Sequence, residues 1–127
     1  AHAGGRFLSP ESMKALVEPQ WTLRDDPPNG ETQRGSICAN GLSVHLIGRV
    51  HAAGCRDDLF GDGGRRLGHL GEAYGLIGGL WLEMRARRGF LYLVTGTSDD
   101  PHRLPAHTGF TRLEEKLVGG LRALPEP

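Results

Sequence analysis

Two apolar runs, separated by a short basic turn, dominate the second half of the chain. The first covers Leu76 to Met84, the second covers Phe90 to Thr97, and the sequence RARRG lies between them. Two such runs around a turn predict an antiparallel hairpin. Side chains alternate along a strand, and in both runs each of the two resulting faces is apolar. We therefore expect both strands in the middle of a sheet that is covered on both sides.

An amphipathic helix is predicted near each end of the chain. The first covers residues 10–18, where Ser9 or Ser12 can cap the helix and Pro10 suits its first turn. The second, within FTRLEEKLVGGLRAL, begins with the capping-box pair Thr111 and Glu114. Its apolar positions recur at helical spacing and predict one buried stripe. The stripe consists of Leu113, Leu117, Val118, Leu121 and Leu124.

The first half of the chain is more weakly patterned. Residues 22–36 contain the turn sequence Pro-Pro-Asn-Gly and few apolar side chains, which predicts an exposed loop. From Gly41 to Val50, the apolar residues Leu42, Val44 and Leu46 alternate with smaller or polar ones. This alternation predicts a strand, and a turn rich in glycine and aspartate follows it.

Together these elements predict an α+β fold, with an antiparallel sheet and the C-terminal amphipathic helix packed on one face. No internal repeat divides the chain, so residues 1–127 are expected to form a single segment. The helix over residues 10–18 is too short to cover the second face of the sheet. We therefore expect the covering layer in polypeptide upstream of Ala1, and expect this chain to be a fragment of a larger domain.

Composition argues against several classes of function. The 127 residues include 15 basic and 15 acidic side chains, and neither half of the chain is strongly basic, so nucleic-acid binding is not expected. No apolar run approaches the roughly 20 residues that a membrane-spanning helix needs. The 20 glycines invite a phosphate-binding interpretation. However, the glycine motifs of nucleotide sites do not occur in the required context, and no cofactor is expected.

Cys38 and Cys55 are the only cysteines. They are expected to be either two buried free thiols or a disulfide that closes a loop of about 18 residues. A disulfide would imply an oxidising compartment, periplasmic or extracellular, whereas free thiols would fit the cytoplasm. A metal site built from Cys55, His51 and His69 is conceivable from ligand type alone, but the spacing fits no recurring zinc pattern, so no metal is expected.

One of the six histidines stands in unusual surroundings. His69 lies in Gly68-His69-Leu70-Gly71, where small residues would let a ligand or another backbone approach closely. The plainer interpretation is a structural histidine in a glycine-rich bend that holds a tyrosine corner. His45 falls on a predicted strand. The remaining histidines lie in predicted termini or loops and are expected to be solvated: His2, His51, His102 and His107.

The stretch GHLGEAYGLIGGLW, followed by a turn and GFLYLVTGTSDDP, resembles the C-terminal part of the serine β-lactamase-like hydrolases. That family includes class C β-lactamases, D,D-peptidases and related esterases. A strand along its active site carries Lys-Thr-Gly or His-x-Gly, and His69-Leu70-Gly71 stands at that position. The opening GGRFLSPESMKALVEPQ resembles a family helix that precedes the final strands, and residues 110–124 resemble the C-terminal helix. The resemblance spans most of the chain.

This resemblance implies acyl-enzyme chemistry on a small-molecule ester, amide or β-lactam. It implies that the backbone N–H of Glu72 donates to the oxyanion, together with the N–H of the nucleophilic serine. His69, Leu70, Gly71 and Tyr74 would line the substrate pocket. Because His69 replaces a cationic lysine, the resemblance favours an esterase or peptidase over a β-lactamase that recognises a carboxylate. Export of the parent protein, as in many relatives, would favour a link between Cys38 and Cys55.

The family nucleophile is the serine of Ser-x-x-Lys, assisted by a Tyr-x-Asn or Ser-x-Asn motif. Neither motif occurs here, since Ser9 and Ser12 are followed three positions later by Ser12 and Ala15. We therefore expect the N-terminal part of the same polypeptide, or a second chain, to supply them, and expect this chain alone to be inactive. Two alternatives stay open: a non-catalytic α+β binding or assembly module, and a degenerate family member that has lost the nucleophile.

Overall fold

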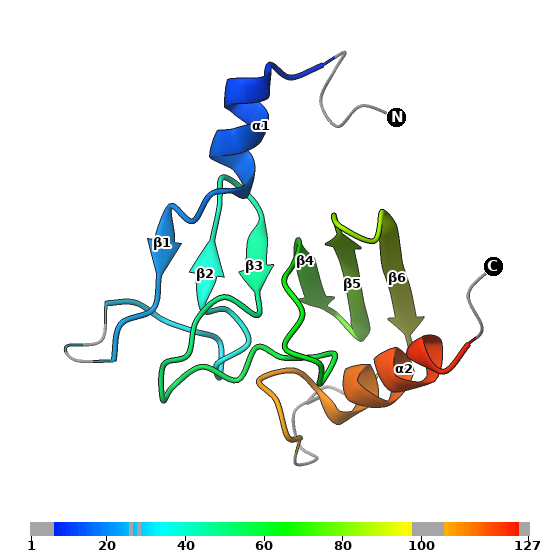
Figure 1. Ribbon diagram of the computed structural model, residues 1–127. Helices are drawn as coiled ribbons and strands as arrows, with labels where there is room; N and C mark the ends of the chain where they lie inside the picture. Colours follow the sequence, from blue (N-terminus) through cyan, green and yellow to red (C-terminus); the bar gives the residue numbers. More distant parts are fainter. Residues whose placement is uncertain (1–6, 26, 28, 98–105, 125–127) are drawn as a thin grey trace.

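Six antiparallel strands form one sheet in which the spatial order of the strands follows their order along the chain. This arrangement comes from a computed structural model that describes residues 7–25, 27, 29–97 and 106–124 (Figure 1). The strands are β1 (Trp21–Thr22), β2 (Ala39–Asn40), β3 (His45–Ile47), β4 (Arg66–Ala73), β5 (Leu76–Glu83) and β6 (Arg88–Thr95). The helices are α1 (Pro10–Val17) and α2 (Arg112–Arg122). The predicted α+β class, with an antiparallel sheet and a C-terminal helix that contacts it, is confirmed.

The three long strands form a meander. A two-residue turn joins β4 to β5, and both of its residues, Tyr74 and Gly75, have positive φ (50° and 80°). Such a turn matches the right-handed twist of the strands that it connects. The register continues from Ala73↔Leu76 to Leu67↔Leu82, and β6 pairs with β5 along its whole length. The predicted hairpin of two apolar strands is β5 and β6.

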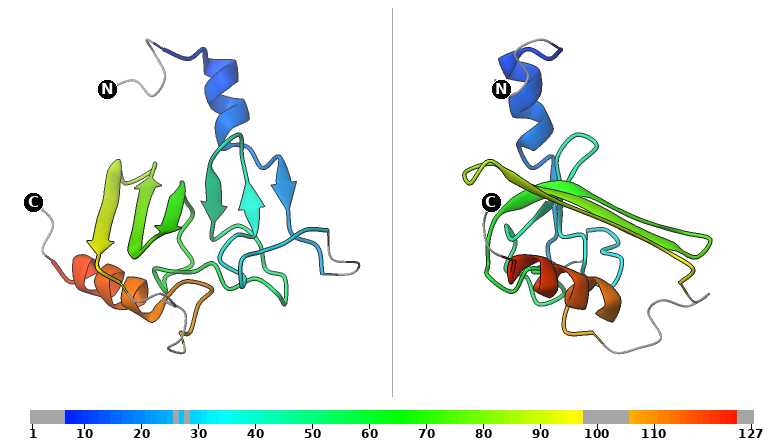
Figure 2. Two further views of the ribbon diagram at one scale, coloured as in Figure 1. Left: turned by 180° about the vertical axis from the view of Figure 1, so that it is seen from behind. Right: turned by 90° about the vertical axis from the view of Figure 1, so that its right-hand side faces the viewer.

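The main hydrophobic core lies between this meander and α2 (Figure 2). Trp81 is fully buried in it, and its ring meets Phe110 edge to face at 5.8 Å between centroids. Burial of such aromatic side chains is the largest contribution to a core of this size. The buried members of the cluster come from the sheet, the β3–β4 loop and the α2 region. They are Ile47, Leu59, Phe60, Ile77, Trp81, Tyr92, Phe110 and Val118.

Helix α2 begins with the predicted capping box. The Thr111 hydroxyl accepts from the N–H of Glu114, and the Glu114 carboxylate accepts from the N–H of Thr111. The predicted buried stripe is partly wrong, because Leu113 and Leu124 are exposed and Glu114 is buried. Glu114 turns inward because its carboxylate also accepts a hydrogen bond from the Tyr92 hydroxyl of β6, at 2.7 Å.

Helix α1 begins at the predicted place, with Ser9 as its cap and Pro10 in its first turn. None of its residues is buried, and it stands at the end of β2 and β3 (Figures 1 and 2). Val17, at its C-terminal end, packs against a small second cluster of Ala39, Leu46 and Leu67. Because α1 lies at one end of the sheet, it leaves the faces of β5 and β6 to other segments.

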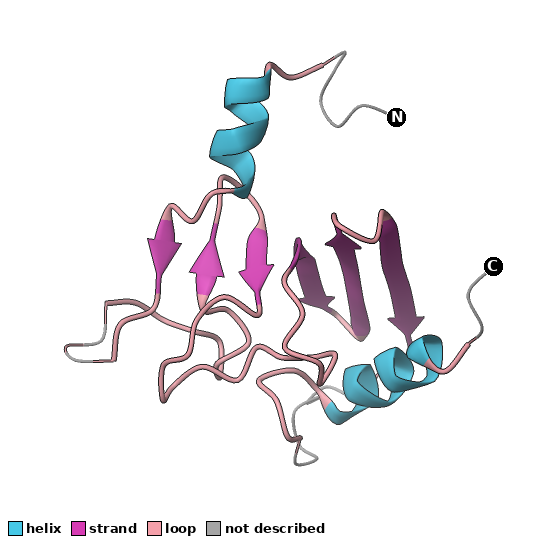
Figure 3. Cartoon of the chain, in the orientation of Figure 1, coloured by secondary structure: helices cyan, strands magenta, loops and turns pink. Residues whose placement is uncertain are grey.

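The first three strands differ from the sequence-based expectation. The strand predicted from Gly41 to Val50 is limited to His45–Ile47. Ser43 has a φ of 58° and belongs to the turn that joins β2 to β3, while Gly48, with a φ of 69°, ends β3. Strands β1 and β2 have two residues each and were not predicted, since two residues carry no alternation. Figure 3 shows the long loops around these short strands.

The sheet face opposite α2 is bare. Three leucines on it, Leu80, Leu91 and Leu93, are 45%, 71% and 66% exposed, and no described segment covers them. The expectation that both apolar strands lie in the middle of the sheet is wrong for β6, which is the edge strand of the described sheet. The expectation of two apolar faces was correct for the sequence, but this chain covers only one of them.

Candidate functional site

His69 stands on the bare face of the sheet. It is directly opposite Leu80 in the β4–β5 register, and Leu80 is directly opposite Leu91 in the β5–β6 register. Residues opposite each other point to the same face of a sheet. The histidine therefore ends a row of exposed leucines, on the side away from α2, and its own side chain is exposed.

Backbone hydrogen bonding fixes the tautomer of His69. Its Nδ1 lies 2.6 Å from the carbonyl oxygen of Leu70, and a carbonyl oxygen can only accept. Nδ1 therefore carries the proton and donates it, which leaves the Nε2 lone pair of the neutral ring as an acceptor. A neutral imidazole with a free lone pair can accept a proton from a substrate or from a nucleophile.

A second histidine supports the first. The ring of His45 stacks on that of His69, with centroids 4.2 Å apart and 26° between the planes. Burial, and then the charge of His69, lowers the pKa of His45 to about 4, so His45 is neutral at pH 7. The sequence gave no sign of this pair, because it depends on the register that places His45 opposite Gly68.

The edge of β4 beside His69 also bears on the site. A two-residue turn with both φ angles positive closes on a hydrogen-bonded pair, Ala73 and Leu76. Bonding to β5 then falls on alternate residues, so Leu70 and Glu72 direct their N–H groups to the opposite edge. On that side β3 pairs with β4 only as far as Gly68. The Glu72 N–H thus points to the edge where the resemblance requires an oxyanion donor.

Space at the site lies on the bare face. A Cβ added to Gly71 would meet no atom within 4 Å, so the backbone there is open to approach. On the other side of the β4 edge, a hollow beside Leu70, Glu72 and Phe110 measures about 20 Å³. That is room for one water molecule, not for a substrate. A ligand would therefore reach His69 from the bare face.

The other residues assigned to the pocket do not gather around His69. Leu70 packs against the main core, on the face of α2. Tyr74 is fully exposed at the tip of the β4–β5 turn, with no described contact to His69. The Glu72 carboxylate lies 3.9 Å from the Arg34 guanidinium in an exposed ion pair. Of the predicted set, His69, the open backbone at Gly71 and the Glu72 N–H share one region.

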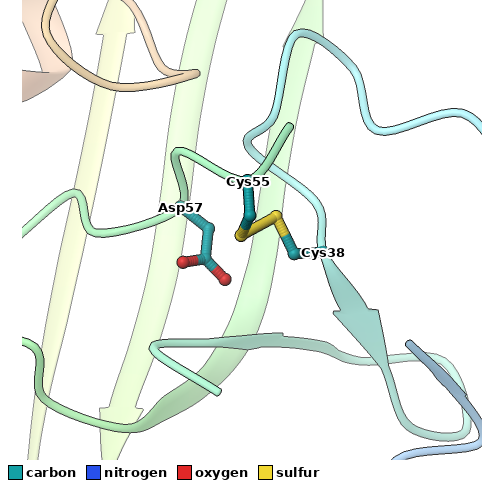
Figure 4. A group of neighbouring side chains, drawn as sticks. All are labelled: Cys38, Cys55 and Asp57. Atoms are coloured by element: carbon teal, nitrogen blue, oxygen red, sulfur yellow. A yellow bond between two sulfur atoms is a disulfide. The ribbon is translucent and has the colours of Figure 1, made fainter. Parts of the chain in front are cut away.

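Cys38 and Cys55 form a disulfide, with their Cα atoms 5.8 Å apart (Figure 4). The carboxylate of Asp57 lies beside it, and among the described residues these three are the one group close enough to share a metal ion. Both sulfurs are already bonded to each other, so they cannot act as thiolate ligands. Burial raises the pKa of Asp57 to about 6.

Comparison of the chain with family models, curated proteins and solved structures returned no match. Neither described helix is long and apolar enough to cross a membrane. His51 and His107 are exposed, as expected for solvated histidines, while His2 and His102 lie outside the described residues.

Proposed function

We propose that this chain is the C-terminal segment of a β-lactamase-like serine hydrolase, and that it forms one wall of an acyl-transfer site. The nucleophile would come from further polypeptide that covers the bare face of the sheet. The substrate would be a small ester, amide or β-lactam, with an ester or peptide favoured because His69 is neutral where relatives carry lysine.

One observation carries the proposal: His69 stands at the end of a row of exposed leucines on a sheet face that nothing in the described chain covers. A protein of this size rarely leaves such a row in water, so a covering layer is expected. A layer seated there would enclose His69, the open backbone at Gly71 and the edge toward which the Glu72 N–H points. A serine delivered to that edge would then have a proton acceptor and an oxyanion donor nearby.

The disulfide agrees with a protein exported to an oxidising compartment, as many hydrolases of this family are. It also ties the β2 strand to the β3–β4 loop, and so holds the short strands next to β4 in place. The site proposed here does not use the two sulfurs directly.

A second candidate is a non-catalytic binding or assembly module. The same exposed leucines favour it, since an apolar face can bury itself against a partner without any chemistry. In that case His69 would be a rim residue of an interface. The two candidates differ in whether a reactive serine arrives with the covering layer.

The test uses a p-nitrophenyl ester, a chromogenic β-lactam and a fluorophosphonate that labels activated serines. The purified 127-residue chain should neither hydrolyse nor become labelled, whereas a longer polypeptide with Ser-x-x-Lys upstream should do both. Turnover by the pure chain that a serine-directed inhibitor abolishes would contradict the assignment of the nucleophile. A folded longer polypeptide with neither activity nor label would support the non-catalytic module instead.

A further inference from the structure

A hollow of about 490 Å³ lies where β4 begins and β5 ends. Four arginines line it: Arg49, Arg65, Arg66 and Arg85. The one carboxylate in the lining belongs to Glu83. The chain as a whole has no net charge, so this concentration of positive charge is local.

The acidic residues around the hollow neutralise only one of these arginines. Arg66 donates to Asp62 at 2.8 and 2.9 Å and to Glu83 at 3.2 Å, and Glu83 also accepts from Arg88. No described carboxylate forms an ion pair with Arg49, Arg65 or Arg85. Three guanidinium groups therefore face the hollow without an anionic partner in the described part of the chain.

Arg49 gives an independent indication of a ligand. Its Nε atom is buried, and no described group accepts a hydrogen bond from it. Buried donors in folded proteins almost always have an acceptor, because an unpaired one loses its bond to water and gains nothing. An anion in the hollow would supply that acceptor, and the planar guanidinium suits a carboxylate or a phosphate.

The remaining lining is apolar. Leu67 is buried and Leu82 half-buried, while Met84 is 48% exposed. Leu67 and Leu82 are directly opposite each other in the β4–β5 register and share the bare face with His69. An inorganic ion would leave these side chains against water, whereas a short alkyl chain would cover them. The volume is within the range of ordinary small-molecule sites.

We propose that this hollow binds a small amphiphilic anion: a carboxylate or phosphate head held by Arg49 and Arg85, and a short apolar chain lying on Leu82 and Met84. The site is distinct from the region around His69. It does not depend on the proposed hydrolase function, because every residue that forms it is in this chain.

Binding is measured by calorimetry and by NMR titration of the purified chain with octanoate, acetate and octylammonium. Octanoate should bind saturably and at least tenfold more tightly than either of the others, because acetate lacks the chain and octylammonium has the wrong charge. The bare leucine face does not distinguish the sign of the head group, so equal binding of octanoate and octylammonium would overturn the proposal. Octyl phosphate and inorganic phosphate give the same comparison for the phosphate head.

Three variants locate the site. Arg85→Gln, at an exposed position, and Arg49→Gln should each weaken octanoate binding about tenfold, while Arg112→Gln on α2 serves as the matched control. Met84→Ser should weaken octanoate but leave acetate unchanged. Circular dichroism checks that each variant is folded, and Arg85→Gln decides the matter if Arg49→Gln does not fold. Octanoate binding that both Arg85→Gln and Met84→Ser leave intact would show that the anion binds elsewhere.

Discussion

At the scale of single residues, two partly desolvated ionisable groups couple the stability of the fold to pH in opposite directions. Burial lowers the pKa of His45 to about 4, so the unfolded chain takes up a proton, below pH 6.5, that the folded chain refuses. Burial raises the pKa of Asp57 to about 6, so between pH 4 and 6 the folded chain holds a proton that the unfolded chain releases. Acid therefore weakens the fold through His45 and strengthens it through Asp57.

The contribution of His45 can be isolated with His45→Gln. In the parent chain, this histidine should cost about 1–2 kcal/mol of unfolding free energy as the pH falls from 6.5 to 4, after allowance for solvent screening. The variant lacks this dependence and retains that of Asp57. Urea unfolding at several pH values gives the difference between the two proteins, which should grow in favour of the variant as the pH falls. His107→Gln, in an exposed loop, is the control, and a pH-independent difference for His45→Gln would contradict the burial argument.

Single residues also show where the sequence pattern was insufficient. The stripe of leucines on α2 was read from spacing alone, and the capping box was recognised correctly. Spacing could not show that Glu114 would be buried, because its partner Tyr92 is 22 positions away in the sequence. The His45–His69 stack was missed for the same reason, since no local signal specifies which residues face each other across two strands.

At the scale of elements, one hydrogen bond joins the C-terminal helix to the last strand. The Tyr92 hydroxyl of β6 donates to Glu114 of α2, which also holds the N-terminus of the helix through Thr111. Burial and the nearby carboxylate raise the pKa of the Tyr92 phenol, so it stays protonated and remains a donor. The bond connects the helix cap with the sheet.

Tyr92→Phe should therefore lower the free energy of unfolding by about 2 kcal/mol, because it leaves a buried carboxylate oxygen without its donor. Tyr74→Phe is the matched control, since the Tyr74 side chain is fully exposed, and it should change stability by less than about 0.5 kcal/mol. Thermal or urea unfolding of both variants provides the measurement. Equal stabilities for the two variants would mean that the Tyr92–Glu114 bond contributes nothing.

The disulfide is the second link between elements, with 17 positions between its cysteines. Reduction should lower the free energy of unfolding by about 3 kcal/mol, mainly because the unfolded chain gains conformational freedom. The chain has no other cysteine, so a reductant affects only this bond. Urea unfolding with and without dithiothreitol, compared with Cys38→Ser/Cys55→Ser, provides the measurement. An unchanged midpoint would mean that the bond does not form or does not constrain the unfolded chain.

Long elements were predictable and short ones were not. β5, β6 and both helices have enough residues to display their period, and each was located from it. β1 and β2 have two residues each, and β3 was overestimated because the alternation of Leu42, Val44 and Leu46 continues across a turn. The backbone at Ser43 and Gly48, which bounds β3, depends on φ angles that hydrophobic pattern does not report.

At the scale of the whole molecule, the sheet has one finished and one unfinished face. Alternation along β5 and β6 predicted two apolar faces, and the structure places α2 against one of them and nothing described against the other. The sequence could indicate the composition of each face but not which segment would cover it. The arginine hollow was not foreseen either, because its members come from the β3–β4 loop and from the far end of β5.

The central claim is that His69 acts at an acyl-transfer site formed when the bare face is covered. The most direct measurement is kcat/KM per folded molecule of His69→Ala in the longer polypeptide, with His107→Ala as the matched control. The account predicts a loss of about 10- to 1,000-fold for His69→Ala, roughly 1.4 to 4 kcal/mol, with the fold retained and the control unchanged. A value within about twofold of the parent, together with a lowered melting temperature, would instead make His69 a structural partner of His45 and contradict the claim.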